Sequence, residues 1–426
     1  MAVCTTGKDV SNEPQVKPGT IAVVSHAVPG GCSGQAVMLQ RLGQLAAEEG
    51  HGPGLLFVDT DRKALRRARL AGDLPVEPIR VPWLLRKLNR LRGFRHRQFP
   101  WLVRYRARRI AAIVRRHQAA AIVGCTGGDL IDVPAAIEAG QQTGLPTYLY
   151  YFDDYAVQWE IAKETWLRDV LPPFRDASES HLLEQAAGII VPNETLAEDI
   201  YQRTETPTVV VRNPVDTQGY AQLRDQFPRR QTDPVRPLRI VYTGSVYTAQ
   251  ADSIRRCSQA IAAAALRGIE AVLHIYGPPP DREVQAELHD TSIVWHQSVS
   301  PEESAAVQVQ ADLLFLPLSF TCSYPQLIRS SAPGKFGEYL ASGTPMLVHA
   351  PEDSFPVRFV SKHDCAAICS NPEVEKLTDT ICSLAKDAAI RDRLGKAAIA
   401  AAADFCQQRN SRRFVEFIQE RMPANR

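Results

Sequence analysis

The sequence predicts an α/β protein made of two doubly wound, Rossmann-like parallel-sheet domains that face each other across a cleft. First, the chain has 426 residues, which is enough for two domains because a domain usually contains roughly 100–200 residues. Second, short apolar runs alternate with longer segments of helical pattern, as in parallel sheets covered by helices on both faces. Third, a polar segment with three prolines, at 219–239, divides these runs into two sets.

Each predicted strand is a short apolar run bounded by turn residues, and a helical segment follows most of them. The predicted strands of the first set are residues 21–24, 54–58, 121–124, 147–151, 188–191 and 209–212. Those of the second set are residues 239–243, 271–276, 293–296, 313–316, 346–349 and 366–369. The predicted organisation is a flexible tail at 1–19, a first domain at 20–218, a linker at 219–237, a second domain at 238–404 and a C-terminal helix at 405–426 that could return to the first domain.

The composition excludes several classes of protein. With 45% hydrophobic and 23% charged residues, the chain is not a collagen, a disordered tail or a small disulfide scaffold. The polar N-terminal segment lacks the apolar region of a secretory signal, and no window of about 18 residues is continuously apolar. The nine cysteines are scattered without a CxxC pair, which predicts reduced thiols, no metal site and a cytoplasmic location.

A glycine-rich turn follows the first predicted strand. In doubly wound sheets, ligands bind beyond the carboxyl ends of the strands. Here the strand leads into PGGCSG, which contains Gly30, Gly31 and Gly34, and then into a helix. The N–H groups at the start of that helix would suit an anion or a hydroxyl group, and a purely structural turn is the alternative. His26 lies in the same turn as a candidate general base or hydrogen-bond partner, or as a partly buried structural histidine.

The first strand of the second domain runs into a comparable loop, VYTGSVYTAQ at 241–250. Gly244 and Ser245 would offer backbone N–H groups and a hydroxyl group to a phosphate. By itself this loop is a weak indication of a binding site.

The most informative pattern lies at 313–350, where a strand, a loop, a helix and a second strand follow one another. Ser330 or Ser331 is predicted to cap this helix. Lys335 falls in the first turn, where a cation is favourable if a phosphate approaches the same helix end. Glu338 lies one turn later, and its carboxylate could accept two hydrogen bonds from the vicinal diol of a ribose. A solvated Lys–Glu pair is the alternative.

The segment SSAPGKFGEYLASGTPMLV resembles the nucleotide-binding segment of the group 1 glycosyltransferases, the family 4-like enzymes of GT-B fold. Other segments resemble theirs in the same order: PGGCSGQAVMLQRLGQLAAEEGH, LEQAAGIIVPNETLAEDI with VVVRNPVDTQGY, VYTGSVYTAQ with LHIYGPPP, and VSPEESAAVQVQADLLFLPL. The similarity covers roughly residues 20–400. It implies a glycosyltransferase that moves a sugar from a nucleotide-diphosphate sugar to an acceptor hydroxyl, in glycan, polysaccharide or glycolipid synthesis at a membrane surface.

The resemblance also implies roles for individual residues. Glu338 matches the acidic residue that binds the ribose diol, and Lys335, with Ser331 and Gly334, lies where the helix N-terminus approaches the phosphates. The other matches are Gly244 and Ser245 in the loop near the diphosphate, Tyr276 and Gly277 beside the nucleotide base, and Gly31 in the first-domain loop that closes on the diphosphate or the sugar. The family handles the leaving group with Lys or Arg and a helix N-terminus, so no metal or other cofactor is expected besides the donor substrate.

The sequence departs from the family pattern in two places. Many members have a further glutamate eight residues before the position of Glu338, where this chain has Ser330. Many also have Arg and Lys in the loop that here contains Tyr247, and Arg329 and Lys335 could supply the positive charge instead. Two alternatives therefore stay open: a catalytically silent GT-B protein that binds a sugar or a partner, and a GT-B-fold sugar-nucleotide epimerase.

The acceptor side belongs to the first domain. Asp153 and Asp154 follow a predicted strand in YLYYFDDY, at the carboxyl end where a general base or an acceptor contact is needed. Helix capping is the alternative for either residue. The catalytic candidates are therefore His26, Asp153 and Asp154. Asp59 and Asp61 have the DxD spacing of a different glycosyltransferase fold, and we interpret them as a coincidence.

Basic charge is concentrated at 80–116. This segment contains 13 of the 49 Lys and Arg residues, and the rest of the chain has a formal charge of −11. Aromatic and leucine residues are interleaved with the cations, a pattern that predicts binding to an anionic membrane surface and fits a glycan or lipid-linked acceptor at the cytoplasmic face. A solvated helical face is the alternative. Nucleic acid is not an expected partner, because no recognition motif accompanies the charge.

Overall fold

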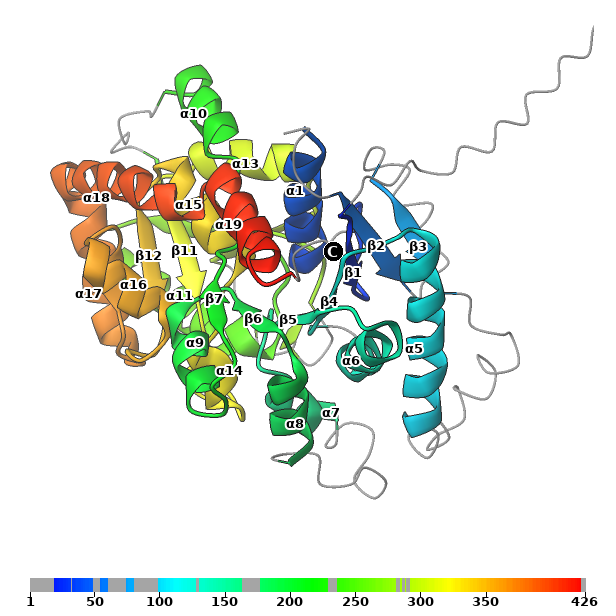
Figure 1. Ribbon diagram of the computed structural model, residues 1–426. Coiled ribbons are helices and arrows are strands. Elements are labelled where there is room, and N and C mark those ends of the chain that lie inside the picture. Colours follow the sequence, from blue (N-terminus) through cyan, green and yellow to red (C-terminus); the bar gives the residue numbers. More distant parts are fainter. Residues whose placement is uncertain are drawn as a thin grey trace, which may run out of the picture.

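The structure is a computed structural model of the chain. It describes residues 19–31, 33–48, 54–59, 74–79, 99–127, 130–162, 177–228, 236–280, 284–285, 288 and 292–422. Two parallel β-sheets, each covered by helices, form two α/β domains (Figure 1). The predicted fold class is therefore confirmed.

The first sheet has seven parallel strands in the order β3-β2-β1-β4-β5-β6-β7. Their bounds are Ile21–Val24 (β1), Leu55–Asp59 (β2), Val76–Pro78 (β3), Ala121–Cys125 (β4), Thr147–Tyr150 (β5), Gly188–Val191 (β6) and Thr208–Val210 (β7). All the predicted strands of this set are present within one or two residues. The sequence missed β3, because three residues that include a proline carry too little strand pattern.

The second sheet has six parallel strands in the order β10-β9-β8-β11-β12-β13. Their bounds are Leu238–Thr243 (β8), Ala271–Tyr276 (β9), Ile293–His296 (β10), Leu313–Pro317 (β11), Met346–His349 (β12) and Ala367–Cys369 (β13). The apolar runs that predicted them are buried on both faces in the central strands, which explains why these runs are continuous rather than alternating.

Helices cover both faces of each sheet. In the first domain they are Gly34–Glu48 (α1), Phe99–Arg116 (α5), Asp132–Thr143 (α6), Tyr155–Ala162 (α7), Ala177–Gln185 (α8) and Glu194–Tyr201 (α9). Those that follow are Thr217–Gln226 (α10), Thr248–Ala265 (α11), Pro301–Val309 (α13), Pro325–Arg329 (α14), Gly334–Ser342 (α15), Phe355–His363 (α16), Val374–Lys386 (α17), Ala388–Ala401 (α18), the 3-10 turn Ala402–Phe405 and Gln407–Gln419 (α19).

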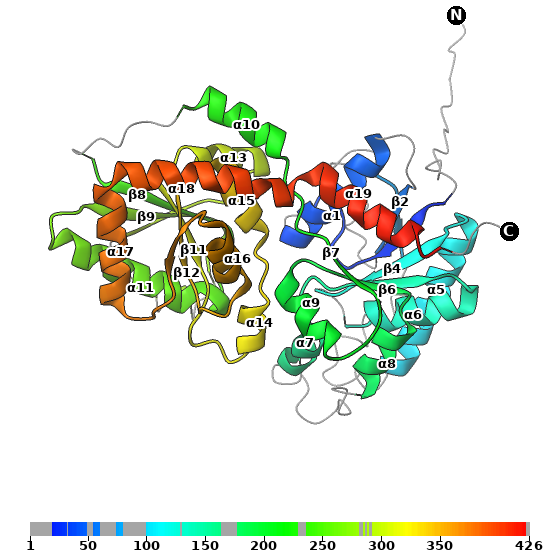
Figure 2. The same ribbon diagram turned by 60° about the vertical axis from the view of Figure 1, so that its left-hand side comes forward.

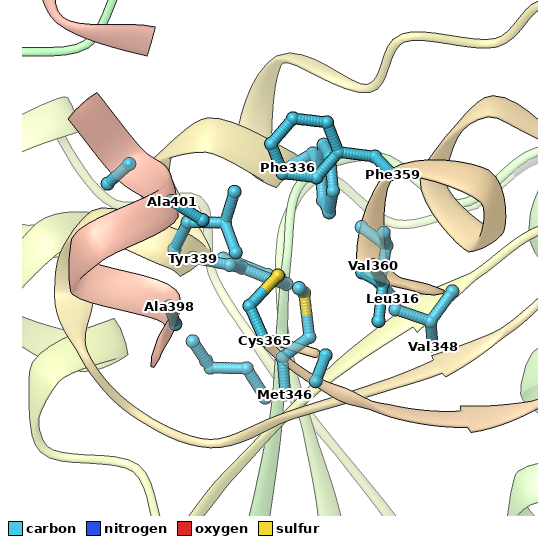
Figure 3. Packing of buried hydrophobic residues seen from close by; sticks show 14 of the residues in the cluster. Leu316, Phe336, Tyr339, Met346, Val348, Phe359, Val360, Cys365, Ala398 and Ala401 are labelled. Carbon is cyan, nitrogen blue, oxygen red and sulfur yellow. The ribbon is translucent and has the colours of Figure 1, made fainter. Parts of the chain in front are cut away.

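Helix α15 lies in the core of the second domain. Phe336 and Tyr339 point from it into a cluster that includes Phe359 and Val360 of α16 and Met346 of β12 (Figure 3). The Phe336 and Phe359 rings meet edge to face with their centroids 5.4 Å apart. This packing fixes the helix, so that the side chains on its other face are held in defined positions.

The C-terminal helix crosses back to the first domain. Helix α18 lies on the second domain, and α19 continues beside α1 (Figure 2). Phe414, Phe417 and Ile418 of α19 belong to the buried cluster of the first sheet, and the Tyr148 hydroxyl donates to the Ile418 carbonyl at 2.9 Å.

The segment predicted as a linker, 219–237, begins inside a helix. Helix α10 is capped by Asp216, whose carboxylate accepts from the Gly219 N–H at 2.9 Å. Tyr220 is buried against the second domain, where its hydroxyl donates to Gln308 Oε1 at 2.6 Å. The prolines that suggested a linker come after this helix, and residues 229–235 lie outside the described part of the chain.

Candidate functional site

The start of helix α15 is open to a ligand. Pro333 occupies the N-cap position, and no side chain caps the helix, so the prediction that Ser330 or Ser331 caps it is wrong. Ser330 is buried and its hydroxyl donates to the Gln326 carbonyl at 3.0 Å, while Ser331 follows it in the connection to α15. A side chain at Gly334 would meet no atom within 4 Å. The N–H groups of Gly334 and Lys335 can therefore be approached by an anion, whereas that of Phe336 donates to the Pro333 carbonyl at 2.9 Å.

Lys335 and the loop after β8 form one unit. The Lys335 ammonium group donates to the Tyr242 hydroxyl at 2.6 Å, and that hydroxyl donates to the Ser245 carbonyl at 2.7 Å. Gly244 has a φ of 120°, and a Cβ there would lie 2.8 Å from Lys335 Nζ. A Cβ at Gly277 would collide with the Gly244 carbonyl oxygen. The fold thus brings together Gly244, Ser245, Gly277 and Lys335.

Burial lowers the pKa of Lys335 to about 7, and the nearby carboxylate of Glu338 acts in the opposite direction. A buried ammonium group loses hydration, which favours the neutral amine. An anion bound beside Lys335 would restore its charge. This arrangement is suited to a ligand that brings negative charge to the start of α15.

Glu338 lies one turn further along α15 and faces the first domain. Its Oε1 is 2.7 Å from Arg41 Nη2 of α1, and its Oε2 is 3.4 Å from Gln308 Nε2 of α13. Neither Arg41 nor Gln308 could be recognised from the sequence, since Arg41 lies 297 positions and Gln308 30 positions from Glu338. Only the packing of α1 against α15 brings Arg41 there.

Arg329, the second cation considered for this site, is paired elsewhere. Its guanidinium group contacts Asp199 and lies 3.7 Å from Glu198, both on α9 of the first domain. Asn193, which caps α9, donates to the Ser330 carbonyl at 2.9 Å. Arg329 and Ser330 thus join the two domains, whereas Lys335 faces the loop at Gly244.

The side chain of Tyr276 packs along the second sheet, against residues of the neighbouring strands. Its hydroxyl is 2.8 Å from Arg239 Nη2, near the beginning of β8, and its ring stacks on His296 with 4.1 Å between centroids. The backbone of Gly277, rather than the ring of Tyr276, therefore borders the loop at Gly244.

The glycine-rich turn of the first domain lies at the carboxyl end of β1. His26 is exposed there, and a Cβ at Gly31 would lie 2.9 Å from Ala36 Cβ. Gln35, in the first turn of α1, donates to the Thr126 carbonyl at 2.8 Å and so ties this helix to the end of β4. The sequence did not single out Gln35, because a glutamine in a first helical turn has no distinctive signal.

The two aspartates after β5 differ in environment. Asp154 is buried, accepts from the Ala156 N–H at 2.9 Å at the start of α7, and pairs with Arg203 at 2.6 Å. Burial and the neighbouring charge of Asp154 raise the pKa of Asp153 to about 6. Burial and, in smaller part, the carboxylate of Asp153 raise the pKa of Tyr247, which belongs to the second domain. The charge of Asp153 therefore acts on Tyr247 of the second domain, while Asp154 has the capping role.

The basic segment at 80–116 is described from residue 99 onward, and residues 80–98 lie outside the described part. In α5, Trp101 is 45% exposed and stacks on Tyr105 with 5.6 Å between ring centroids. Arg104 and Arg108 are exposed on the same helix. Within the described ranges, no helix is long and apolar enough to cross a membrane. Nor does the described part of the chain contain three or more His, Cys, Asp or Glu residues grouped as metal ligands.

Known structures share this architecture. A glycosyltransferase from Rickettsia africae ESF-5 matches with a TM-score of 0.66 and 11% identity, covering 96% of this chain and 100% of that one. HepE from Anabaena, in complex with UDP and glucose, matches with a TM-score of 0.65 and 12% identity over 94% and 99% of the two chains. A putative UDP-N-acetylglucosamine 2-epimerase from Listeria monocytogenes matches with a TM-score of 0.60 and 12% identity over 95% and 96%.

These likenesses show that the chain has the two-domain fold of GT-B glycosyltransferases. No protein-family model matches the sequence, and no curated protein matches it.

Proposed function

We propose that the protein is a family 4-like glycosyltransferase, which transfers a sugar from a nucleotide-diphosphate sugar to an acceptor hydroxyl. The observation that carries the proposal is the convergence of Lys335, the glycine loop at Gly244 and the open start of α15, with Glu338 one helical turn away. A cation, backbone N–H groups and a carboxylate at these spacings match a diphosphate and the ribose next to it. The structure of Anabaena HepE, which has the same fold, contains bound UDP and glucose.

Each group has a defined part in the proposed reaction. The bond between the sugar C1 and the diphosphate oxygen breaks, and that oxygen keeps the electron pair. Lys335 and the N–H groups at the start of α15 stabilise the departing charge without a metal ion. The acceptor oxygen bonds to C1, and its proton passes to a base.

Asp153 is the proposed base. Its pKa of about 6 leaves it ionised at neutral pH and closer to the working pH than an ordinary aspartate. Its charge also acts on Tyr247 of the second domain, where the donor is proposed to bind. His26, exposed at the end of β1, is proposed to contact the sugar or the acceptor.

A thermal-shift screen tests the donor site. Uridine, guanosine and adenosine diphosphates and their sugars are added, and a ligand at about 100 times its Kd should add about 2.7 kcal/mol of stability. Glu338→Ala should remove the shift, whereas Glu352→Ala, an exposed carboxylate on the same domain, should keep it. If no nucleotide stabilises the wild-type protein, the enzyme proposal fails.

The epimerase alternative rests on the shared fold of the Listeria monocytogenes protein. An epimerase would convert a nucleotide sugar with no acceptor present. Incubation of the stabilising nucleotide sugar alone, followed by NMR of the sugar, separates the two reactions. A changed sugar still attached to its nucleotide would favour the epimerase, and a nucleotide diphosphate formed only with an acceptor would favour the transferase.

We also propose that the acceptor is reached at an anionic membrane surface in polysaccharide or glycolipid synthesis. Helix α5 presents Trp101, Arg104 and Arg108 on its exposed side, a pairing of aromatic and basic side chains that suits a lipid interface. Sedimentation with vesicles containing anionic lipid should show binding that salt weakens. The double variant Arg104→Gln/Arg108→Gln should reduce it.

The matched control is Lys386→Gln/Lys396→Gln, which removes the same charge from exposed positions of the second domain. Equal loss in both double variants would indicate an effect of net charge alone. Absence of salt-sensitive binding by the wild-type protein would reject the membrane proposal.

A further inference from the structure

Arg41 joins the first domain to the carboxylate proposed to bind ribose. Its Nη2 lies 2.7 Å from Glu338 Oε1, and its Nη1 donates to the Pro214 carbonyl at 2.8 Å. The side chains of Arg41 and Glu338 are only 17% and 19% exposed. The backbone of Arg41 is also held, since its carbonyl accepts from Gln407 Nε2 of α19 at 2.9 Å. The guanidinium group is therefore held by the Pro214 carbonyl besides Glu338, and the backbone of Arg41 is held by α19.

The second oxygen of Glu338 is oriented from its own domain. Gln308 Nε2 lies 3.4 Å from Oε2, and Gln308 is itself fixed by the Tyr220 hydroxyl at 2.6 Å and by Thr243 Oγ1 at 3.0 Å. Each carboxylate oxygen has about two acceptor positions. One donor at each oxygen leaves room for a hydroxyl group at each, which is what a ribose diol requires.

Arg41 is also the charged partner of this carboxylate. Burial raises the pKa of Tyr220 and of Tyr339, and the nearby charge of Glu338 adds to both shifts. Arg41 is the cation at hydrogen-bond distance from it in the described structure. Because the guanidinium group is charged, its hydrogen bond is stronger than a neutral one, so this contact holds the Glu338 side chain in one orientation.

We propose that Arg41 is a positioning residue that determines specificity for ribonucleotides over 2′-deoxyribonucleotides, by orienting Glu338 toward the ribose diol of the donor. The inference rests on the proposed function, and it adds that the ribose site is complete only when the two domains are in contact at Arg41. The ligand class is a nucleoside diphosphate, free or attached to a sugar.

The test compares one nucleoside diphosphate with its 2′-deoxy form, in wild type and in Arg41→Gln. The nucleobase is that of the nucleoside diphosphate that stabilises the wild-type protein most. Loss of a hydrogen bond to a charged group usually weakens binding by about tenfold or more, so the wild type should prefer the ribose form by that factor. In Arg41→Gln the preference should fall toward one, with the affinity for the deoxy form little changed. Such a cycle isolates the coupling between the residue and the hydroxyl.

Two further variants keep the test decisive. Arg358→Gln breaks another contact between the domains, the pairing of Arg358 with Glu198 at 2.8 Å, and does not touch Glu338. It should leave the ribose preference unchanged. Arg41→Lys keeps a positive charge, but a single ammonium group cannot reproduce both contacts of the guanidinium fork. It should give an intermediate preference, and it serves if Arg41→Gln does not fold.

Three outcomes overturn the proposal. If the preference persists in Arg41→Gln, Glu338 is oriented without Arg41. If Arg41→Gln and Arg358→Gln both lower the affinity for the two nucleotides by the same factor, Arg41 only stabilises the contact between the domains. If the wild type binds no nucleoside diphosphate, the proposed function and this inference fail together, whereas the first two outcomes leave the proposed function standing.

Discussion

The ammonium group of Lys335 lies 2.6 Å from the Tyr242 hydroxyl and 4.0 Å from the centre of the same ring. This contact connects the start of α15 to the end of β8, where Gly244 approaches the same ammonium group. Removal from water lowers the pKa of Lys335 to about 7. The charge of this residue therefore depends on pH in the physiological range, which an ordinary lysine would not show.

The first prediction concerns the pH dependence of donor binding. The neutral amine does not attract a diphosphate, so the affinity for a nucleotide sugar should fall as the pH rises from about 6 to about 8, and binding should take up a proton. Isothermal titration calorimetry in two buffers of different ionisation enthalpy measures both effects. A nucleotide sugar is the right probe, because its diphosphate does not titrate in this range.

The control for this prediction is Lys335→Met, which should bind the donor more weakly at every pH and without proton uptake. A wild-type affinity that does not change between these two pH values would show that Lys335 stays charged or does not meet the diphosphate.

A second prediction contrasts Asp153 with Asp154. Because the pKa of Asp153 is raised from 3.8 to about 6, the folded protein holds this proton more tightly than the unfolded chain does. Ionisation of Asp153 therefore lowers the free energy of unfolding. This loss of stability grows as the pH rises from roughly 4 to roughly 6 and stays constant at higher pH. Asp153→Asn should raise Tm by a few degrees at pH 7, leave it nearly unchanged at about pH 4, and lower the transfer rate by about 100-fold or more.

Asp154→Asn should act in the opposite direction on stability. It removes the charge that pairs with Arg203 and weakens the helix cap, which should cost about 3 kcal/mol of unfolding free energy. Denaturant unfolding of the two variants at neutral pH gives the comparison. If Asp153→Asn destabilises the protein as much as Asp154→Asn does, the assignment of roles is reversed.

The third prediction concerns three glycines around the donor site. Gly244→Ala should cost about 1–3 kcal/mol, since its φ of 120° is unfavourable for an L-residue and its methyl group would press on Lys335. Gly277→Ala should be worse, because the new Cβ collides with backbone. Gly334→Ala meets no atom and should leave the free protein as stable as wild type or slightly more stable. Its donor affinity should still fall, because the methyl group occupies the place proposed for the diphosphate.

The fourth prediction separates the two cations near α15. Arg329 is engaged with Asp199 and Glu198, so Arg329→Gln should change donor affinity by less than about threefold, while Lys335→Met should weaken it by about tenfold or more. Binding measured at pH 6, where Lys335 is charged, gives the clearest contrast. A tenfold loss of donor affinity in Arg329→Gln would indicate that Arg329 contacts the diphosphate.

Much of the fold could be predicted from the sequence for a local reason. Strands such as 313–317 and 346–349 are buried on both faces and therefore appear as continuous apolar runs. The short strand β3 was missed because three residues carry almost no pattern, and most of α10 was included in the predicted linker because the segment 219–239 is polar and contains three prolines. Local composition does not report what a partly exposed helix packs against.

The two-sheet architecture, the place of Gly244 at the carboxyl end of a strand, and the places of Lys335 and Glu338 in the first turns of a helix could be predicted from the sequence. These features depend on residues close together in the chain. The packing of the two domains was needed to show that Arg41 meets Glu338, that Arg329 pairs with the first domain, and that Asp154 rather than Asp153 pairs with Arg203 and caps α7. These outcomes depend on contacts between residues far apart in the chain. Ion pairing and burial are properties of the packed domains, and neighbouring aspartates with the same sequence environment acquire different roles from what each one faces.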